Sequence, residues 1–314
     1  CDMKSILIGE KKLSNMTLGT VQLGMNYGIA NTTGQPAEEE SFAMLGAALK
    51  GGVSSIDTAR VYGNSEDVIG HFFRQYDGEL PFITTKVPKI EGETEGEIEK
   101  FVVSSVETSL EKLGVPRVNC VMLHVTADIT AHGDKTAKAL ESLVKRGYTD
   151  LVGASVYLTN EVDDMLKSDV YTAIQVPMSI FDQRLIHSGA IDRLGARGVT
   201  VFVRSVFLQG IFFLDPEKIT DPILVEQAAP RIRLLREYAE REGISVASLA
   251  IAFIRDLPGV SSLVLGSDTK AQVEQNIGYF DVPPISERTA ADIKRDFADV
   301  DIPEIMKVLS RPKK

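Results

Sequence analysis

The sequence predicts an α/β protein that folds as a (β/α)8 barrel, also called a TIM barrel, with an N-terminal β-hairpin and extra C-terminal helices. From Met16 onward, eight short apolar segments each precede a longer segment of helical character. Segments 118–123, 199–203 and 261–265 are almost wholly apolar, which is typical of parallel strands buried on both faces. Eight such β-α units in a chain of 314 residues are the pattern of a (β/α)8 barrel.

An open, doubly wound sheet is the main alternative for the same alternation of strands and helices. That fold would place a G-x-G-x-x-G loop after an early strand. The glycines between residues 19 and 28 do not have this spacing, and Gly34 precedes no such turn. The barrel is therefore favoured, and residues 1–314 are expected to form a single barrel domain.

The first elements follow from turn and helix-start signals. Two β-like runs, 5–8 and 16–18, are separated by residues 9–12, which predicts a hairpin leading into the first barrel strand. The glycine-rich loop 22–36 is longer than most β-α connections, and such loops often carry binding residues. Pro36 and the acids that follow it open a helix that Gly51 ends.

The later elements are delimited in the same way. Asn64 is a candidate helix N-cap, and Gly114, Gly147 and Gly198 follow the ends of expected helices. Further strands are expected at 54–57, 82–86, 118–123, 150–155, 172–176, 199–204 and 261–265. Further helices are expected at 64–75, 95–113, 134–146, 160–167, 187–196, 224–242, 245–256, 269–279 and 285–297, followed by a tail with Pro303 and Pro312.

The composition excludes several classes of protein. Hydrophobic residues make up 44% and charged residues 25% of the chain, as in ordinary globular proteins. The net charge of −10 argues against nucleic acid as a partner. No apolar run approaches the roughly 18 residues that span a bilayer, and no signal-like segment opens the chain, so we expect a cytoplasmic protein with no membrane partner. Cys120 is expected to be a reduced core residue.

Three successive strands end in residues whose side chains can act in catalysis. Asp57, Lys86 and His124 stand at or just after the ends of expected strands, and Tyr62 lies in the loop that follows Asp57. The carboxyl ends of the strands form the active site of a (β/α)8 barrel. Each residue taken alone has a structural explanation: a loop acid, a half-buried loop aromatic, a surface lysine or a core histidine. Their shared position predicts a catalytic site.

At these residues the sequence resembles the aldo-keto reductase family, over roughly residues 16–280. The resemblance implies a barrel and the nicotinamide-dependent interconversion of a carbonyl compound (an aldehyde, a ketone or a sugar) and an alcohol. The segments that carry it are Leu18-Gly19-Thr20, Ile56-Asp57-Thr58-Ala59, Tyr62-Gly63-Asn64-Ser65-Glu66, Thr85-Lys86, Leu123-His124, Gly153-Ala154-Ser155, Ile174-Gln175, Arg204-Ser205, Leu208-Gln209-Gly210, and Leu265-Gly266-Ser267 to Asn276.

The resemblance implies a role for each of the four strand-end residues. A carbonyl that accepts hydride develops negative charge on its oxygen, which calls for a proton donor and electrostatic stabilisation there. Tyr62 would donate the proton, and Lys86 would lower the pKa of that phenol by favouring its charged form. Asp57 would pair with Lys86, and His124 would hydrogen-bond the carbonyl oxygen.

The resemblance also implies a site for NADP or NAD. Ser155 and Gln175 would bond the nicotinamide carboxamide, with Val156 where the family usually has Asn. Arg204 replaces the usual aromatic, and its guanidinium could stack on the nicotinamide or bind an anionic substrate group. The residues implied for the cofactor are Gly19, Thr20, Asp57, Ser155, Gln175, Arg204, Ser205, Leu208, Gln209, Gly210, Gly266, Ser267, Thr269, Gln272 and Asn276.

The adenosine end of this site departs from the NADP-preferring members of the family, which commonly carry Lys or Arg there. Asp268 and Gln272 stand at the corresponding positions, with Lys270 between them. A carboxylate repels a 2′-phosphate and accepts hydrogen bonds from ribose hydroxyls. We therefore expect a weakened preference for NADP.

The substrate is expected to be a small carbonyl compound, a polyol or a sugar. The first loop is polar, and the segment after residue 299 contains no aromatic residue that would serve as an apolar lid. Each aromatic candidate for the pocket lining could equally be a core residue. The candidates are Met25, Tyr27, Val125, Phe207, Phe212 and Phe213.

Two other functions fit the same residues. A cofactor-binding regulatory barrel subunit would keep the site but turn over little, and a barrel lyase or isomerase would use Lys86 to form a Schiff base. The remaining histidines, His71, His132 and His187, do not form a pair with metal-ligand spacing, so no metal is expected. The sequence indicates neither the oligomeric state nor the physiological direction of the reaction.

Overall fold

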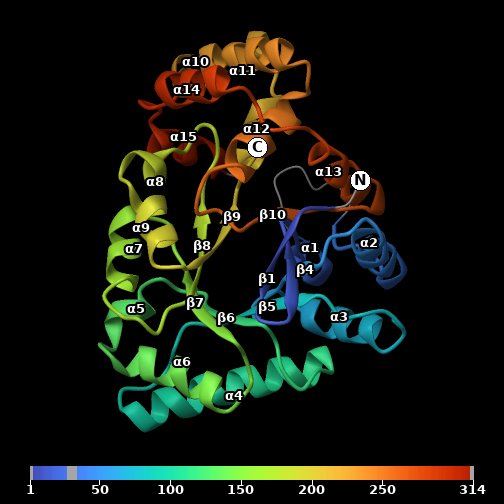
Figure 1. Ribbon diagram of the computed structural model, residues 1–314, viewed down its shortest axis with the longest axis vertical. Helices are drawn as coiled ribbons and strands as arrows, with labels where there is room; N and C mark the ends of the chain where they lie inside the picture. The colour runs from blue at the N-terminus through green and yellow to red at the C-terminus, as the bar shows by residue number, and fades with distance from the viewer. Residues whose placement is uncertain (1–2, 27–33, 312–314) are drawn as a thin grey trace.

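Eight parallel strands close into a barrel surrounded by helices in the computed structural model, which describes residues 3–26 and 34–311 (Figure 1). The strands follow one another around the barrel in chain order, and β10 pairs with β3 to close it. The predicted (β/α)8 fold is confirmed. The barrel strands are β3 (Met16–Gly19), β4 (Ser55–Asp57), β5 (Phe82–Val87), β6 (Cys120–Leu123), β7 (Leu151–Ser155), β8 (Ala173–Pro177), β9 (Thr200–Arg204) and β10 (Ser262–Gly266).

Helices connect these strands and extend past the last one. The helix predicted at 95–113 has those bounds, because Thr94 and Glu97 form a capping box at its start and Gly114 takes a left-handed conformation at its end. In the described parts of the chain, no helix is both long and apolar enough to cross a membrane. The helices up to β9 are α1 (Val21–Gly24), α2 (Glu38–Lys50), α3 (Ser65–Phe73), α4 (Glu95–Leu113), α5 (Asp128–Ala131), α6 (Lys135–Lys145), α7 (Thr159–Met165), α8 (Arg184–His187) and α9 (Ala190–Ala196).

The helices after β9 include two short 3-10 helices between β9 and α10. They are η1 (Leu208–Phe213), η2 (Pro216–Lys218), α10 (Pro222–Gln227), α11 (Ala229–Glu242), α12 (Val246–Arg255), α13 (Lys270–Tyr279), α14 (Glu287–Asp296) and α15 (Ile302–Leu309).

The amino-terminal hairpin forms with a different second strand from the one predicted. β1 (Ser5–Ile8) pairs antiparallel with β2 (Lys11–Ser14), whereas the run at 16–18 belongs to the barrel strand β3. Lys11 and Lys12 gave the segment a turn-like composition. The second strand forms nonetheless because Leu13 is fully buried among Phe82, Cys120 and other side chains of the barrel interior.

The barrel interior is apolar over part of its length and polar at the carboxyl ends of the strands. Leu13, Phe82 and Phe202 belong to an apolar cluster inside the barrel. The same cluster contains Cys120, a thiol whose pKa burial raises, so the prediction of a core position for this cysteine is confirmed. Polar side chains occupy the carboxyl ends of the strands, where Lys86 is almost completely buried.

Two local predictions about helices are wrong, and a third is confirmed only for the position of the residue. The helix expected at 224–242 is two helices, α10 and α11, because Pro230 has no N–H to continue the backbone hydrogen bonds of α10 and is instead accommodated in the first turn of α11. The expected tail contains the helix α15, which Asp301 caps by accepting from the backbone N–H of Glu304 at 3.1 Å. Asn64 is at the N-cap position of α3, as predicted, but its side chain makes no capping bond and accepts from Gln35 Nε2 at 2.8 Å instead.

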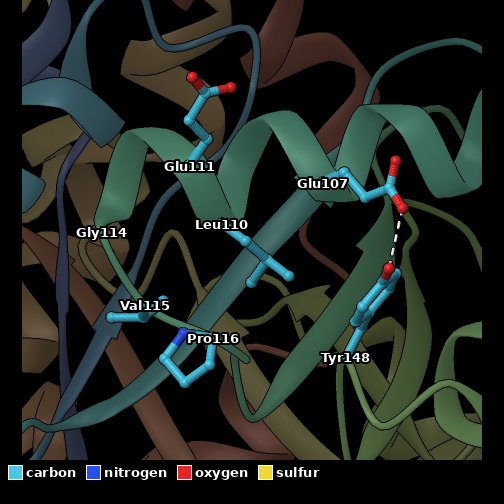
Figure 2. Close-up of a pocket in the computed structure, with 7 residues that line it drawn as sticks. All are labelled: Glu107, Leu110, Glu111, Gly114, Val115, Pro116 and Tyr148. Carbon is cyan, nitrogen blue, oxygen red and sulfur yellow. Dashed lines mark hydrogen bonds between the residues drawn. The ribbon is translucent and has the colours of Figure 1, made fainter.

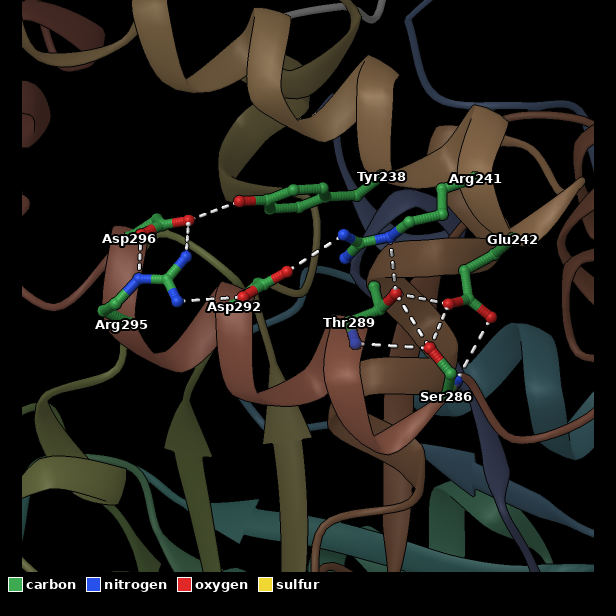
Figure 3. Close-up of polar contacts among 8 residues, drawn as sticks. All are labelled: Tyr238, Arg241, Glu242, Ser286, Thr289, Asp292, Arg295 and Asp296. Atoms are coloured by element: carbon green, nitrogen blue, oxygen red, sulfur yellow. Dashed lines mark hydrogen bonds and ion pairs between the residues drawn. The ribbon is translucent and has the colours of Figure 1, made fainter.

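A network of charged and hydroxyl groups fastens α14 to α11 (Figure 3). Arg241 of α11 donates to Asp292 of α14 at 2.9 Å and to the hydroxyl of Thr289 at 3.1 Å. Tyr238 donates its hydroxyl proton to Asp296 on the next turn of α14. These contacts hold the predicted C-terminal helix α14 against α11, beside α10 and α15 at the top of Figure 1.

Candidate active site

A buried ion pair lies at the carboxyl end of the barrel. Lys86, near the end of β5, donates from Nζ to the two carboxylate oxygens of Asp57, at the end of β4, at 2.6 and 2.7 Å. The two strands are parallel neighbours, so their carboxyl ends meet at one face. Only 1% of the Lys86 side chain and 4% of the Asp57 side chain are exposed. The carbonyl oxygen of Thr58 accepts a further bond from Nζ at 3.0 Å.

The Lys86 amine is held in its charged form. Burial alone lowers the pKa of a lysine, because it disfavours the ammonium. At Lys86 the attraction of Asp57 and of Tyr62 outweighs burial and raises the pKa above its ordinary value. Gln175 of β8 donates from Nε2 to Asp57 Oδ1 at 2.8 Å, which further orients the carboxylate.

Tyr62 lies in the loop between β4 and α3, beside the ion pair. The centre of its ring is 5.1 Å from Lys86 Nζ. Two glycines fix the path of this loop. A β carbon on Gly24 would lie 1.7 Å from the Tyr62 carbonyl oxygen, and one on Gly63 would lie 2.0 Å from the Gly24 carbonyl oxygen. The backbone of the loop therefore packs directly on the end of α1, which places the phenol beside the ammonium.

His124 follows β6 and completes the cluster. Its ring meets the Tyr62 ring edge to face, with centroids 5.6 Å apart. Burial, together with the charge of Lys86, lowers the pKa of His124 to about 4. The imidazole is therefore neutral at pH 7, with one nitrogen as donor and the other as acceptor. The structure brings the four strand-end residues together at one face of the barrel, and their catalytic roles stay predictions.

Four of the residues implied for the cofactor lie at the carboxyl ends of β3, β7 and β8, on the two sides of this cluster. Gly19 of β3 lies in register with Asp57 on one side and with Gly266 on the other. Thr20 donates from Oγ1 to the backbone carbonyl of Asp57 at 2.8 Å. Ser155, at the end of β7, is buried and lies in register with Gln175 of β8.

Arg204, at the end of β9, is held in place by a neighbouring loop. Its Nη2 donates to the carbonyl oxygen of Val156 at 3.1 Å, and its guanidinium carbon lies 4.2 Å from the centre of the Tyr157 ring. The positive charge of Arg204 also contributes to the lowered pKa of His124. Sequence reasoning missed Tyr157, because a cation–π partner on another loop leaves no local signal in the sequence.

The segment 205–210 has an unusual backbone. Three residues other than glycine have positive φ: Ser205 at 62°, Leu208 at 44° and Gln209 at 56°. Each such residue costs about 1–3 kcal/mol, and they concentrate at ligand clamps and active sites. Gly210 continues the left-handed path with φ 86°. The segment implied for the cofactor is therefore also the segment that stores backbone strain.

The junction of β10 and α13 carries the residues implied for the adenosine end. Asn276 donates from Nδ2 to Ser267 Oγ at 3.1 Å, which joins the first residues after β10 to the second turn of α13. A β carbon on Gly266 would lie 2.5 Å from Nε2 of Gln22, so this glycine admits the Gln22 side chain. The sequence had not singled out Gln22.

Thr269 and Gln272, the two remaining residues implied for the cofactor, lie at the start of α13. Thr269 caps the helix, since its Oγ1 accepts from the backbone N–H of Gln272 at 3.2 Å. Glu40 of α2, a residue that the sequence had not singled out, accepts from the backbone N–H of Lys270 at 2.7 Å.

Residues 15–295 match the model of the family described as "Aldo/keto reductase family". The chain belongs to the aldo/keto reductase family. Members of this family are oxidoreductases that act on small carbonyl or sugar substrates. The resemblance drawn from the sequence motifs is thus confirmed.

This aldo/keto reductase is similar to L-glyceraldehyde 3-phosphate reductase of Escherichia coli (strain K12), with 25% identity over 91% of each chain. A probable voltage-gated potassium channel subunit beta of Oryza sativa subsp. japonica is 24% identical over 88% of this chain and 92% of its own. The holo form of aldo-keto reductase AKR11C1 from Bacillus halodurans has a TM-score of 0.74 at 21% identity, covering 93% of this chain and 96% of that chain. That structural likeness supports the fold.

The candidates for the substrate pocket of this aldo/keto reductase differ in exposure. Phe212 is 1% exposed and stacks on Phe181 with ring centroids 5.0 Å apart, so it is a core residue. Phe213 is 52% exposed and Met25 is 38% exposed. Val125 and Phe207 are half-buried. Tyr27 lies outside the described residues.

A surface hollow of about 400 Å³ lies on this aldo/keto reductase away from the strand-end residues (Figure 2). Tyr148 donates from its hydroxyl to Glu107 at 2.8 Å at one side of this hollow. Val115 and Pro116 precede β6 and Tyr148 precedes β7, so the hollow is at the amino-terminal side of the barrel. Its lining residues are Glu107, Leu110, Glu111, Gly114, Val115, Pro116 and Tyr148.

Proposed function

We propose that this family member interconverts a carbonyl compound and the corresponding alcohol by hydride transfer with NAD or NADP. Tyr62 serves as general acid in reduction and as general base in oxidation. The observation that carries the proposal is the position of the Tyr62 ring, 5.1 Å from a buried Lys86 ammonium at the carboxyl face of the barrel. A bound nicotinamide would supply or accept the hydride.

Proton transfer to the substrate oxygen follows from this cluster. In reduction, the phenolic hydroxyl of Tyr62 gives its proton to the carbonyl oxygen as hydride reaches the carbonyl carbon. The Lys86 ammonium stabilises the phenolate that remains, and Asp57 keeps the ammonium charged and in place. The phenolate then takes a proton from solvent, and oxidation of the alcohol reverses these steps.

His124 orients the substrate oxygen. A neutral imidazole keeps one N–H donor for the carbonyl oxygen without adding a second positive charge beside Lys86. Its lowered pKa, about 4, maintains this state through the neutral pH range. Burial and the nearby ammonium therefore select the form of His124 that can donate one hydrogen bond.

The residues around the cluster fit a dinucleotide. Ser155 and Gln175 lie side by side at the strand ends and would bond the nicotinamide carboxamide. The strained segment 205–210 would run along the pyrophosphate, and residues 266–276 would hold the adenosine. Oε1 of Gln22 is buried with no hydrogen-bond partner among the described residues, and its side chain packs against Gly266. Such an unmatched acceptor supports a ligand at this end of the site.

The substrate is proposed to be a small hydroxy-carbonyl compound, a polyol or a sugar. The relative named L-glyceraldehyde 3-phosphate reductase supports a small, polar carbonyl substrate. Arg204 offers a positively charged group at the same face, and its contacts with Val156 and Tyr157 hold it in position. An anionic substituent on the substrate would find its partner there.

Two other functions receive less support from the site. A Schiff base requires a neutral amine, and the raised pKa of Lys86 opposes that form. A regulatory subunit with little turnover is the alternative that the relative named as a potassium channel subunit beta suggests. The presence of all four strand-end residues in one cluster favours turnover.

The decisive test is the Tyr62→Phe variant. We expect its kcat to fall by at least about 100-fold, because general acid–base groups typically contribute that much or more. The assay follows the absorbance of reduced nicotinamide across a panel of aldehydes, ketoses and sugars, and a fluorescence titration checks that cofactor binding persists. Tyr148→Phe, at the opposite side of the barrel, is the matched control and should keep full activity. Undiminished turnover by Tyr62→Phe would remove the mechanism.

A further inference from the structure

Several backbone N–H groups at the start of α13 are already bonded by the protein's own side chains. The amide of Asp268 donates to Gln272 Oε1 at 2.6 Å, and that of Gln272 donates to Thr269 Oγ1 at 3.2 Å. The amide of Lys270 donates to Glu40 Oε1 at 2.7 Å. A phosphate at a helix amino terminus binds through such N–H groups. At α13 it would first have to displace a side chain.

Glu40 reaches this helix from a distant part of the chain. It lies in the first turn of α2, which packs beside α13 on the right of Figure 1. Its neighbour Glu39 is exposed, whereas Glu40 is half-buried against the helix start. Glu40 therefore brings a carboxylate to the positive end of the α13 dipole, where an anionic ligand would otherwise be favoured.

The positive charge of Lys270 does not fully offset the Glu40 carboxylate. Lys270 contributes one positive charge, but its Nζ lies 3.6 Å from the Glu274 carboxylate on the next turn. The Lys270 ammonium is therefore shared with Glu274, and a dianionic group at the helix start would still meet repulsion from the Glu40 carboxylate.

We propose that Glu40 is a specificity residue that commits the cofactor site to NAD(H) by excluding the 2′-phosphate of NADP(H). The inference rests on the proposed function, because it concerns the adenosine end of the same site. A 2′-phosphate would face the Glu40 carboxylate and find the amides of Asp268 and Lys270 occupied. A ribose 2′-hydroxyl is neutral and can donate to a carboxylate, so the same groups tolerate it.

The test measures binding rather than turnover. Fluorescence titrations with NADH and with NADPH give Kd values for the unchanged protein, for Glu40→Gln and for the control Glu39→Gln. The unchanged protein should bind NADH at least about tenfold more tightly than NADPH, since a single charge near a phosphate is worth that much. Glu40→Gln should tighten NADPH binding about tenfold and change NADH binding less than about threefold. Glu39→Gln should change neither.

A second variant tests the same idea with Glu40 in place. Gln272→Arg releases the amide of Asp268 and adds a cation, so it should also tighten NADPH binding about tenfold. Tighter binding of NADPH than of NADH by the unchanged protein would overturn the inference and leave the proposed function standing. An unchanged ratio of the two Kd values in Glu40→Gln would have the same consequence. Failure of the unchanged protein to bind either dinucleotide would overturn the proposed function, and the inference with it.

Discussion

Removing one partner of the buried pair between Asp57 and Lys86 should destabilise the protein far more than removing a surface charge. The two side chains are 4% and 1% exposed, and Lys86 Nζ bonds both carboxylate oxygens at 2.6 and 2.7 Å. Asp57→Asn leaves the ammonium without its counter-charge, and Lys86→Met leaves the carboxylate without its own. Each change should lower the free energy of unfolding by about 3–5 kcal/mol, the cost of an uncompensated buried charge.

The double variant shows whether that loss comes from the pairing. Asp57→Asn combined with Lys86→Met removes both charges, so no buried charge is left unpaired. Its free energy of unfolding should exceed the value expected from adding the two single losses by about 1–3 kcal/mol. The surface pair Lys145–Glu141, at 2.8 Å with side chains 69% and 47% exposed, supplies the control. Glu141→Gln should cost less than about 1 kcal/mol.

Urea unfolding followed by far-ultraviolet circular dichroism gives these free energies by linear extrapolation. The reasoning is refuted if the single variants cost no more than Glu141→Gln, or if their losses simply add in the double variant. The pH dependence provides a further check. The folded state raises the pKa of Lys86, so its contribution is fully present below the unfolded value of about 10.4 and is lost as the pH rises through the higher folded value. The unchanged protein should therefore lose stability above that pH more steeply than the double variant.

Three further predictions concern other residues. The pKa of His124 is about 4 in the folded protein and about 6.5 in the unfolded chain, so the folded protein should lose stability as the pH falls from about 6.5 to about 4. The urea midpoint measures this loss, which should be smaller in the His124→Gln variant. A β carbon on Gly153 would lie 1.9 Å from a carbonyl oxygen of β8, so Gly153→Ala should lower the free energy of unfolding by at least about 3 kcal/mol. Gly46 in α2 has open space around it, so Gly46→Ala should raise the free energy of unfolding by about 0.5–1 kcal/mol. Arg204→Met should raise the KM of a phosphorylated aldehyde about tenfold and that of its unphosphorylated counterpart little, and equal effects on both would contradict an anion-binding role.

The order of the elements and the position of the strand-end residues were readable in the sequence. Helix and strand periodicities are local properties, and glycines and caps mark the ends, as at α4. Parallel strands in a barrel all point their carboxyl ends to one face, so residues placed at strand ends converge whatever their separation in the chain. Asp57, Lys86 and His124 could therefore be assigned to one face from the sequence alone.

Contacts between distant segments were decided by the tertiary structure. Gln175 and Asp57 are 118 positions apart, and Glu40 and Lys270 are 230 apart, so no local pattern pairs them. The positive φ at Ser205 is equally invisible, because a residue other than glycine takes it only when its surroundings impose it. The pKa of His124 likewise follows from burial and a neighbouring ammonium, which exist only once the barrel has closed. Local periodicity thus determined the fold, whereas long-range packing set the charges and the cofactor preference that we infer.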